Sequence, residues 1–524
     1  MNLPVLVSIL VVYFVIMSGL AYYGYKKTQT ESDYLLAGRN IHPVVMALSY
    51  GATFISTSSL IGFGGVASQY GFSLLWLAFL NIVLGIFVAF AVLGTRIRRL
   101  SADMDVYTFS SFLGKRYDSS FITVFSGAMI FLFMPAYTSI VLIGGGRFLQ
   151  EALGIDFNSA LLILAFIVGF YVISGGLKAV MYTDAFAALI MLVMMIMLLF
   201  GTYQHVGGVI DGHSSLTELK PLIPEELVEQ GHRGWTAMPE SGSPLWWTLV
   251  STLIMGVGIG VLAQPQLVMR SMTVKDDRSL YRSVLVGGLF IFFMTGAAYM
   301  IGPLSNLYFF ETQGEIAMEA VGGNVDLVIP TLINHMMPVW FVYLFTLTAL
   351  SAVISTVSSL IHVQAASFSE DILKTWGIRS SKVSLSRLGV VIGMVAAVIL
   401  AYILPGGVIA QSTAFWFGIC AAGFLPALIG GLYWKKASRA GANASMVVGF
   451  SVSVIGFLFF HEKEAEAIGL SDALFGKDTL LGFPISHIDP LFYALPLSTI
   501  VFILVSLATG VNVKRNKEKT SVVQ

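Results

Sequence analysis

The feature that most constrains this chain is the recurrence of apolar segments about 20 residues long, the length of helix that crosses the hydrocarbon of a bilayer. About thirteen of them follow one another. Lipid offers the backbone no hydrogen-bond partners, so each crossing is expected to be a helix. We therefore predict an all-α polytopic membrane protein with segment cores at 4–25, 43–67, 73–94, 121–146, 158–176, 184–204, 245–269, 283–305, 338–366, 384–404, 408–434, 441–460 and 488–510.

Composition agrees with a lipid environment. Hydrophobic residues make up 56% of the 524 residues and charged residues only 11%, whereas soluble domains are about a quarter charged. The formal net charge is zero, so no nucleic-acid partner is expected. Cys420 is the single cysteine, which excludes an intrachain disulfide and a CxxC metal or redox site. The start of the chain lacks a basic region and a cleavage site, so we expect the first segment to be retained in the cell membrane.

The distribution of basic residues predicts the orientation, because cytoplasmic loops are enriched in Lys and Arg. With the N-terminus outside and the C-terminus in the cytoplasm, 24 of the 29 basic residues fall on the cytoplasmic side, Lys178 and Arg270 among them. The two longest polar insertions, 205–244 and 306–337, then lie outside. Residues 1–510 are expected to form one transmembrane domain, followed by a basic cytoplasmic tail at 511–524.

Two of the predicted spans are unlike the others. Residues 49–68 crowd small and hydroxyl side chains, and residues 255–267 contain three glycines and Pro265. Such stretches interrupt a helix, and interrupted segments at matching places in two halves are typical of the central site of a transporter. The alternative is tight small-residue packing between helices. Because the two spans are five apart, we expect an inverted repeat, with repeat one at about 43–204 and repeat two at about 245–434.

Four stretches in order resemble the sodium:solute symporter family, whose members include pantothenate, monocarboxylate and proline symporters. They are DYLLAGRN at 33–40, GGLKAVMYTDAFAA at 175–188, ALSAVISTVSSLIHVQAASFSEDIL at 349–373 and GLYWKKASRAGANASMVVG at 431–449. Tyr182 and Ala187 depart from the usual Trp and Gln of the family. The resemblance implies a LeuT-type 5+5 inverted repeat with one extra N-terminal and two extra C-terminal helices. It also implies sodium-driven import of a small organic solute by alternating access.

The resemblance implies a first sodium site built from two helices. Main-chain carbonyls of Ala52, Ile55 and Ala352 and the hydroxyls of Ser355 and Thr356 would be its ligands. The residue types suit a hard cation, which prefers oxygen ligands. A helix broken after Ile55 would also free carbonyls. The alternative is that the two hydroxyls bond only to the preceding turn of their own helix.

A second sodium site is implied by three further residues that some members of the family share, Asp184, Ser358 and Ser359. Ser355, Ser358 and Ser359 are three and four residues apart and share a helical face. An acidic residue inside a membrane segment is a functional candidate by default. The alternative is that Asp184 only caps its helix at the membrane interface.

The solute is expected between the two broken spans. By analogy it faces Phe54, Ser56 and Ser59 on the first, and Val257 and Val261 on the second. Proline transporters of the family carry an Asp at the position of Phe54 and aromatics at the two valine positions. The segment NVDLVIPTL at 324–332 looks more like pantothenate or monocarboxylate carriers. This likeness favours a monocarboxylate or pantothenate-like acid. No lone Arg or Lys in mid-membrane indicates an anion, and proline or another neutral amino acid stays an alternative.

Other function classes fit the sequence less well. A channel needs a continuous polar pore with a filter, and neither is visible. A membrane enzyme needs a nucleophile–base pair or a metal cluster, and the eight histidines show no ligand spacing. A solute sensor of the family would carry a fused signalling kinase, whereas this chain ends soon after its last span. We therefore expect no enzymatic activity and no cofactor, with sodium as the coupling ion and the solute, sodium and lipid as the partners.

Overall fold

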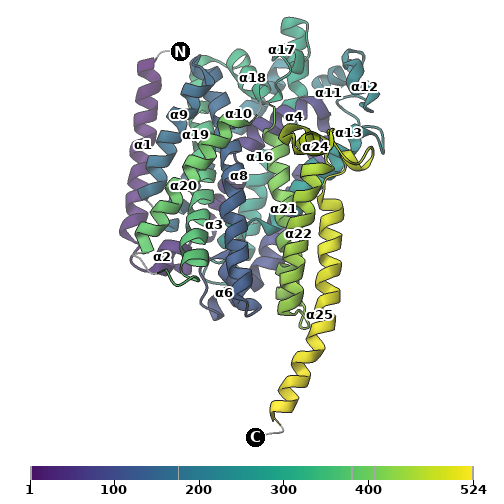
Figure 1. The fold of residues 1–524 in the computed structure, drawn as a ribbon. Coiled ribbons are helices and arrows are strands. Elements are labelled where there is room, and N and C mark those ends of the chain that lie inside the picture. Colours follow the sequence, from purple (N-terminus) through teal and green to yellow (C-terminus); the bar gives the residue numbers. More distant parts are fainter. Residues whose placement is uncertain (1–2, 175, 379–381, 405–406, 522–524) are drawn as a thin grey trace.

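The computed structural model describes residues 3–174, 176–378, 382–404 and 407–521. Within these ranges every regular element is a helix, and the long helices stand side by side in one bundle (Figure 1). Eleven helices in the described chain are long and apolar enough to cross a membrane. Two predicted spans correspond to the shorter apolar helices Pro43–Phe54 and Phe157–Gly169. The expected number of thirteen spans therefore stays a prediction.

The first half of the bundle contains the first broken span. Its helices are α1 (Leu3–Lys26), α3 (Pro43–Phe54), η2 (Ser58–Gly62), α4 (Phe63–Tyr70), η3 (Gly71–Leu74), α5 (Leu75–Ile82), η4 (Val83–Gly94), α6 (Thr95–Asp103), α8 (Ser120–Leu153), α9 (Phe157–Ser174) and α10 (Leu177–His205). The connecting helices on the side of α6 are α2 (Glu31–Leu36), η1 (Ala37–Arg39) and α7 (Phe109–Arg116).

The second half begins with the second broken span. Its helices are α13 (Pro244–Trp247), η6 (Thr248–Gly256), α14 (Val257–Gly260), η7 (Val261–Ala263), α15 (Pro265–Ser271), α16 (Asp277–Gln313), α19 (Val339–Ala366), η9 (Ser367–Leu373), α20 (Lys382–Ile403) and α21 (Ile409–Tyr433). Two further long helices follow, α22 (Arg439–Phe459) and α25 (Leu491–Ser521).

Short helices form most of the end of the molecule that carries the N-terminus (Figure 1). They are α11 (Val209–Glu218), η5 (Lys220–Leu222), α12 (Glu225–Glu229), α17 (Ala317–Ala320), η8 (Val325–Leu327), α18 (Val328–Met336), α23 (Glu462–Ile468), α24 (Leu470–Phe475) and η10 (Ile485–His487). The 205–244 insertion packs on the first broken span, where the Phe72 amide donates to the Trp235 carbonyl at 2.7 Å. The C-terminus lies at the opposite end of the bundle (Figure 1).

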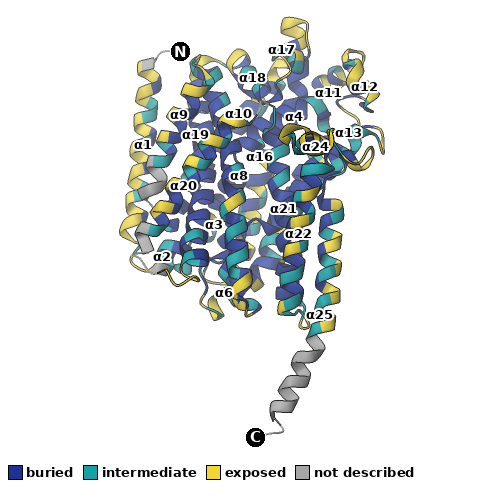
Figure 2. Cartoon of the chain, viewed as in Figure 1, coloured by how far each residue is buried: buried dark blue, intermediate teal, exposed yellow. Residues whose placement is uncertain are grey.

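Burial separates central from peripheral helices (Figure 2). In the most apolar window of α19 and its continuation η9, 94% of residues are buried, and in α21 89%. The corresponding shares are 17% for α1 and 28% for α25. The helices before and after the predicted repeats therefore lie outside, and α19 lies at the centre.

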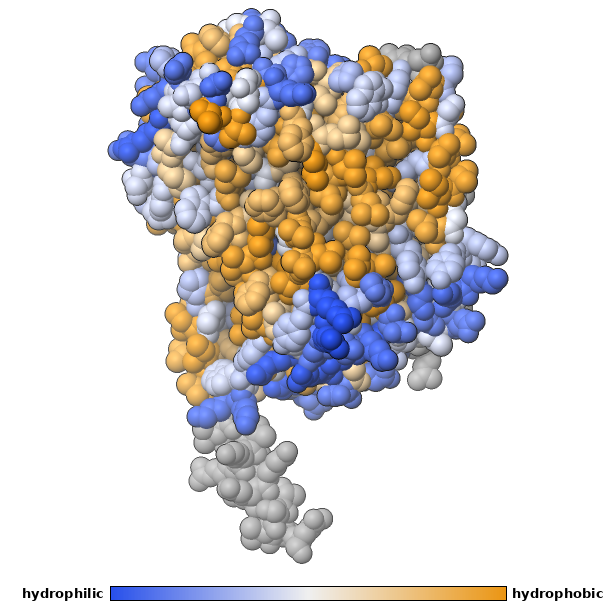
Figure 3. Space-filling view, turned by 180° about the vertical axis from the view of Figure 1, so that it is seen from behind, coloured by the Kyte–Doolittle hydropathy of each residue, from blue (hydrophilic) through white to orange (hydrophobic). Residues whose placement is uncertain are grey.

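The surface has the form expected of a bilayer protein. Seen from behind, hydrophobic side chains form a broad band across the middle, and hydrophilic ones gather toward both ends (Figure 3). Exposed residues of this kind include Leu132, Phe166, Phe200 and Leu285. Water would not tolerate so large an apolar patch on a monomer, so the band is the surface that contacts lipid.

Small residues allow close approach between helices. A Cβ on Gly65 of α4 would lie 2.0 Å from the Val325 carbonyl oxygen. A Cβ on Gly302 of α16 would lie 2.2 Å from the Gly64 carbonyl oxygen. The packing alternative considered for the 49–68 stretch is therefore part of its role, alongside the helix break described below.

Two of the four sequence motifs touch each other at the end of the bundle that carries α2. Lys178 Nζ lies 2.5 Å from Asp33 Oδ1. Asp33 also accepts hydrogen bonds from the Thr30 amide and hydroxyl in a capping box. Partial burial raises the pKa of the Asp33 carboxyl, but the hydrogen bonds from Lys178 and Thr30 outweigh it and lower the pKa to about 2. Asp33 is thus a carboxylate that ties α2 to the start of α10. Gly175 of the second motif lies outside the described residues.

The orientation is testable by labelling single cysteines from one side. Glu229 is exposed in the 205–244 insertion, and Lys436 is exposed in the turn between α21 and α22. A membrane-impermeant maleimide added to intact cells is expected to label Glu229→Cys at once and Lys436→Cys only after permeabilisation. Cys420 is fully buried and gives a low background. Labelling of both positions from the same side would contradict the predicted topology.

Candidate functional site

The first broken span is interrupted where the sequence predicts it. Helix α3 ends at Phe54, and Ile55 leaves helical geometry with φ −85° and ψ 87°. The Ile55 amide still donates to the Gly51 carbonyl at 2.7 Å. In the next turn the Ser58 amide donates to the Ser56 hydroxyl at 3.1 Å. Hydroxyl side chains thus satisfy part of the backbone that the break frees, as buried backbone in a membrane requires.

The centre of α19 packs against this break through two hydroxyls. Ser355 Oγ donates to the Ala52 carbonyl oxygen at 2.9 Å and approaches the Ala352 carbonyl oxygen at 3.3 Å. Thr356 Oγ1 lies 3.3 Å from the same Ala52 oxygen and 3.2 Å from the Thr53 oxygen. Both hydroxyls therefore reach across to α3, and only Ser355 also bonds within its own helix.

The chemistry of this cluster suits a sodium ion. Ala52, Ile55, Ala352, Ser355 and Thr356 all have exposed fractions of 1% or less. The groups that meet here are the two hydroxyls and the carbonyl oxygens of Ala52, Thr53 and Ala352, and such oxygens are ligands of hard cations. The hydroxyl hydrogens rotate freely, so the same hydroxyls that now donate to Ala52 can turn their lone pairs toward an ion. The donor set fits, and its occupant stays a prediction.

The second broken span is interrupted at Gln264. This residue is extended, with φ −71° and ψ 116°, and Pro265 opens the next helix, α15. Proline suits the first turn of a helix because its missing N–H would have no partner there. Gln266 Nε2 donates to Gln264 Oε1 at 3.2 Å, and both side chains are buried. The break thus places two amide side chains inside the bundle.

Arg270 of α15 is the cation bound by the second group of predicted residues. Its Nη2 lies 2.6 Å from Ser359 Oγ, 3.0 Å from Thr53 Oγ1 and 3.1 Å from Asp184 Oδ2. Ser49 Oγ donates to the same Asp184 oxygen at 2.9 Å. Arg270 and Asp184 have side-chain exposed fractions of 2% and 1%.

The position of Arg270 differs from the one that the count of cytoplasmic basic residues predicts. Arg270 counts among the cytoplasmic basic residues in the sequence, yet its guanidinium is buried and paired with Asp184. Ser358 does not contact it, and Ser358 Oγ instead donates to the Ser355 carbonyl at 3.2 Å. Asp184 is not a solvated helix end, since hydroxyls of α3 and the guanidinium of α15 surround it.

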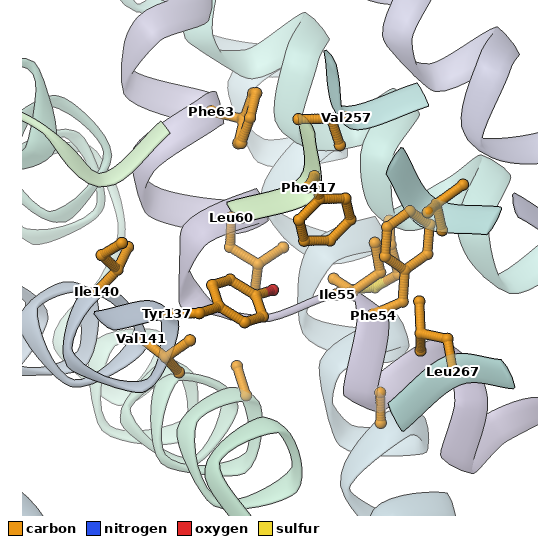
Figure 4. Packing of buried hydrophobic residues seen from close by; sticks show 14 of the residues in the cluster. Phe54, Ile55, Leu60, Phe63, Tyr137, Ile140, Val141, Val257, Leu267 and Phe417 are labelled. Carbon is orange, nitrogen blue, oxygen red and sulfur yellow. The ribbon is translucent and has the colours of Figure 1, made fainter. Parts of the chain in front are cut away.

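The predicted solute-facing residues lie around an aromatic group. Phe54, Tyr137 and Phe417 approach one another beside the first break, with Val257 close by (Figure 4). The Phe54 and Phe417 ring centres are 6.4 Å apart, and those of Tyr137 and Phe417 are 5.6 Å apart. The Tyr137 hydroxyl is hydrogen-bonded to Ser56.

The other predicted solute-facing residues are Val261 and Ser59. Phe54 and Val261 both lie within 3.5 Å of the Cβ position of Gly85, so they share one wall. Ser59 is only half-buried and is the second residue of η2, directly after the break. Sequence reasoning missed Tyr137, Phe417 and Gln264. Only Gln264 carried a signal, because it is a polar residue directly before a proline within an apolar span.

Cavities of different size lie toward the two ends of the described part of the bundle. A cavity of about 550 Å³ opens among Gln69, Tyr70, Gln411, Lys463 and Glu466, at the end formed by the short helices. The cavities on the opposite side are about 10 Å³ each, and one is lined by Tyr34, Ser358 and His362. The largest of these three cavities therefore lies at the end formed by the short helices.

A family model decides which family this is. The model described as the sodium:solute symporter family matches residues 34–449. The chain belongs to the sodium:solute symporter family. It is accordingly a sodium-coupled solute transporter of the membrane, and the relatives are transporters rather than enzymes.

Individual relatives and a solved structure agree with this family. A sodium/pantothenate symporter of Haemophilus influenzae is 28% identical, with 87% of this chain and 90% of the relative covered. A sodium/proline symporter 2 of Staphylococcus saprophyticus is 30% identical, with 85% and 84% covered. The structure of a Na⁺-coupled sialic acid symporter in a substrate-bound outward-open state superposes with a TM-score of 0.72 at 17% identity, covering 96% and 97% of the chains. The expected LeuT-type fold is thereby confirmed.

The buried ion pair makes a prediction about stability. Removing one partner leaves a buried charge unpaired, which typically costs about 3–5 kcal/mol of the free energy of unfolding. Asp184→Asn and Arg270→Gln are each expected to lower the unfolding temperature in sodium-free detergent solution. The fall in unfolding temperature of the double variant is expected to be smaller than the sum of the falls in the two single variants. Strict additivity in thermal unfolding would show that the two groups do not interact.

Proposed function

We propose that this symporter imports a small organic acid, a monocarboxylate or a pantothenate-like molecule, together with sodium. The observation that carries the proposal is the break after Ile55 facing the Ser355 and Thr356 hydroxyls of α19. A cation bound by these oxygens would lie beside the residues that line the aromatic group. Ion and solute would therefore bind next to each other.

The side chains around the aromatic group support a solute with an apolar body. Phe54, Val257, Val261 and Phe417 offer mainly hydrocarbon, and all are buried. Polar contacts come from the Ser56 and Tyr137 hydroxyls, which are bonded to each other. A carboxylate bound there would accept hydrogen bonds from these hydroxyls, and the neighbouring sodium ion would offset its charge. This pairing makes solute binding depend on sodium without a basic side chain.

Alternating access follows from where the breaks lie. The half-helices on either side of Ile55 and Gln264 are able to tilt separately, and transporters with interrupted helices alternate by rocking around such a site. In the state described here the larger cavity lies on the side of the short helices. Sodium and solute entering from that side would first stabilise closure of this cavity. The ends of α3 and α15 would then separate.

Asp184, Ser358 and Ser359 are proposed as a second cation site. Carboxylate and hydroxyl oxygens of Asp184, Thr53 and Ser359 converge within 3.1 Å of one cationic nitrogen. That convergence supports cation binding at this position.

A neutral amino acid such as proline is the second candidate. The observation that favours it is the 30% identity to a sodium/proline symporter over most of both chains. Phe54 stands against it, because by family resemblance the proline carriers have an acidic residue there. A zwitterion carries an ammonium group, and the described wall of Phe54, Val257 and Val261 offers no carboxylate to receive it.

Uptake into proteoliposomes decides between the candidates. Radiolabelled pantothenate, pyruvate, lactate and proline are offered with an inward sodium gradient and with choline in its place. The proposal expects sodium-dependent, saturable uptake and counterflow for one of the acids and none for proline. Uptake of proline alone would establish the second candidate, and non-saturating flux would indicate a channel.

The first sodium site predicts a double variant. Ser355→Ala with Thr356→Ala removes two oxygens from a desolvated ion, and each loss costs about 1–3 kcal/mol. The sodium concentration for half-maximal uptake is therefore expected to rise about tenfold or more. Thr346→Ala is the matched control, because Thr346 lies on α19 but bonds only to the Val342 carbonyl. Unchanged sodium dependence in the double variant would place the ion elsewhere.

The aromatic group predicts a separate effect on the solute. Phe54→Ala removes a wall that Phe417 stacks on, and truncating a buried phenylalanine costs about 3–5 kcal/mol where it is packed. The KM for the solute is expected to rise strongly. The sodium concentration for half-maximal uptake is expected to change only as far as sodium binding and solute binding are coupled. Phe87→Ala, at an exposed position on η4, is the control. Equal effects of the two variants would show that Phe54 does not face the solute.

A further inference from the structure

The guanidinium of Arg270 sits where an ion would sit. Its Nη2 atom carries two hydrogens, yet three oxygens lie within 3.1 Å of it, from Ser359, Thr53 and Asp184. Three close oxygens around one nitrogen resemble the coordination of a cation more than a set of linear hydrogen bonds. Asp184 and the two hydroxyls are also the kind of oxygen ligands that a hard cation selects.

The rest of the Arg270 side chain is poorly satisfied. Its Nε is buried and has no hydrogen-bond partner among the described residues. A bidentate pair with Asp184 would use Nε or the second terminal nitrogen as well, but only Nη2 reaches the carboxylate. The geometry therefore favours one cationic nitrogen at the oxygen cluster over a full fork-shaped pairing.

A sodium ion and Arg270 exclude each other at this position. Both would occupy the space bounded by Asp184 Oδ2, Thr53 Oγ1 and Ser359 Oγ. If sodium entered while the guanidinium stayed, two positive charges would face one carboxylate in a buried place, where water screens little. The site thus holds a single cation at a time.

Arg270 is attached to a part of the chain that follows the second break. It lies six residues after Gln264, on the seven-residue helix α15. Asp184 belongs to α10, Thr53 to α3 and Ser359 to α19. One guanidinium therefore joins the ends of both broken spans to α10 and α19, as an ion coordinated by all of them would.

We propose that Arg270 is a tethered cation that takes the place of a second sodium ion at Asp184, so that the wild-type symporter couples solute to one sodium. This inference rests on the proposed sodium coupling and adds the number of ions. Sodium binds at Asp184 only when the guanidinium is removed.

The test uses sodium alone, so it does not depend on knowing the solute. Binding of ²²Na⁺ to the purified protein is measured for wild type, Arg270→Gln and the double variant Asp184→Asn/Arg270→Gln. The expected stoichiometry is near one for wild type, near two for Arg270→Gln and near one again for the double variant. Arg39→Gln is the matched control, because Arg39 is half-buried and bonds to Ser101 and Val106, away from Asp184.

Thermal unfolding gives a second readout. The Arg270→Gln protein leaves the Asp184 charge unpaired, so sodium is expected to raise its unfolding temperature more than it raises that of wild type, and choline is not. Arg270→Lys keeps a tethered cation and is expected to behave as wild type. A purely structural arginine would give a destabilised protein that sodium rescues no better than choline does.

The outcomes separate this inference from the proposed function. Wild-type protein that binds two sodium ions, or an Arg270→Gln protein that still binds one, overturns the tethered-cation role while sodium coupling stands. Wild-type protein that binds none overturns both. If Arg270→Gln does not fold, Asp184→Asn replaces it. Sodium binding equal to wild type is then expected, and a loss of one bound ion contradicts the proposal.

Discussion

The structure depends on one constraint, which is that backbone polar groups inside a bilayer need partners within the protein. A helix meets this requirement everywhere except where it breaks. The chain breaks at Ile55 and again at Gln264, and each break is buried against other helices. The Ser355 and Thr356 hydroxyls of α19 serve the first break, and the side chains of Gln264 and Gln266 pair at the second. The most buried helix of the bundle is thus the one that faces the interruption.

Charged side chains inside the bilayer, like backbone polar groups, need partners within the protein. An isolated carboxylate in this interior would be strongly unfavourable, and Asp184 is accompanied by Arg270 and by the hydroxyls of Ser49 and Thr53. The group is neutral overall and joins the three helices α3, α10 and α15, which lie far apart in the sequence. These contacts therefore join the half-helix α15 to α3 and α10 in addition to apolar packing.

The sequence was informative where the signal is local. Segment length and hydropathy located the helices. The small-residue stretch at 49–68 located the first break, and the glycines with Pro265 at 255–267 located the second. The family resemblance led us to expect the Ser355 and Thr356 hydroxyls opposite Ala52, and both hydroxyls contact the Ala52 carbonyl oxygen. Tyr137 and Phe417 lie on ordinary apolar helices, so nothing nearby in the sequence marks them. Arg270 was misjudged because positive-inside counting assigns a basic residue near a span end to water, whereas its partner Asp184 is distant in sequence.

The single cysteine has a consequence for observing the transport cycle. Cys420 lies on α21 one turn beyond Phe417, and its thiol is hydrogen-bonded to Gln264 at the second break. It is fully buried in the state described here. Thiol reagents act only on accessible sulfur, so the rate at which Cys420 reacts reports how often α21 and the Gln264 break separate. The native thiol therefore reports that motion without any engineered cysteine.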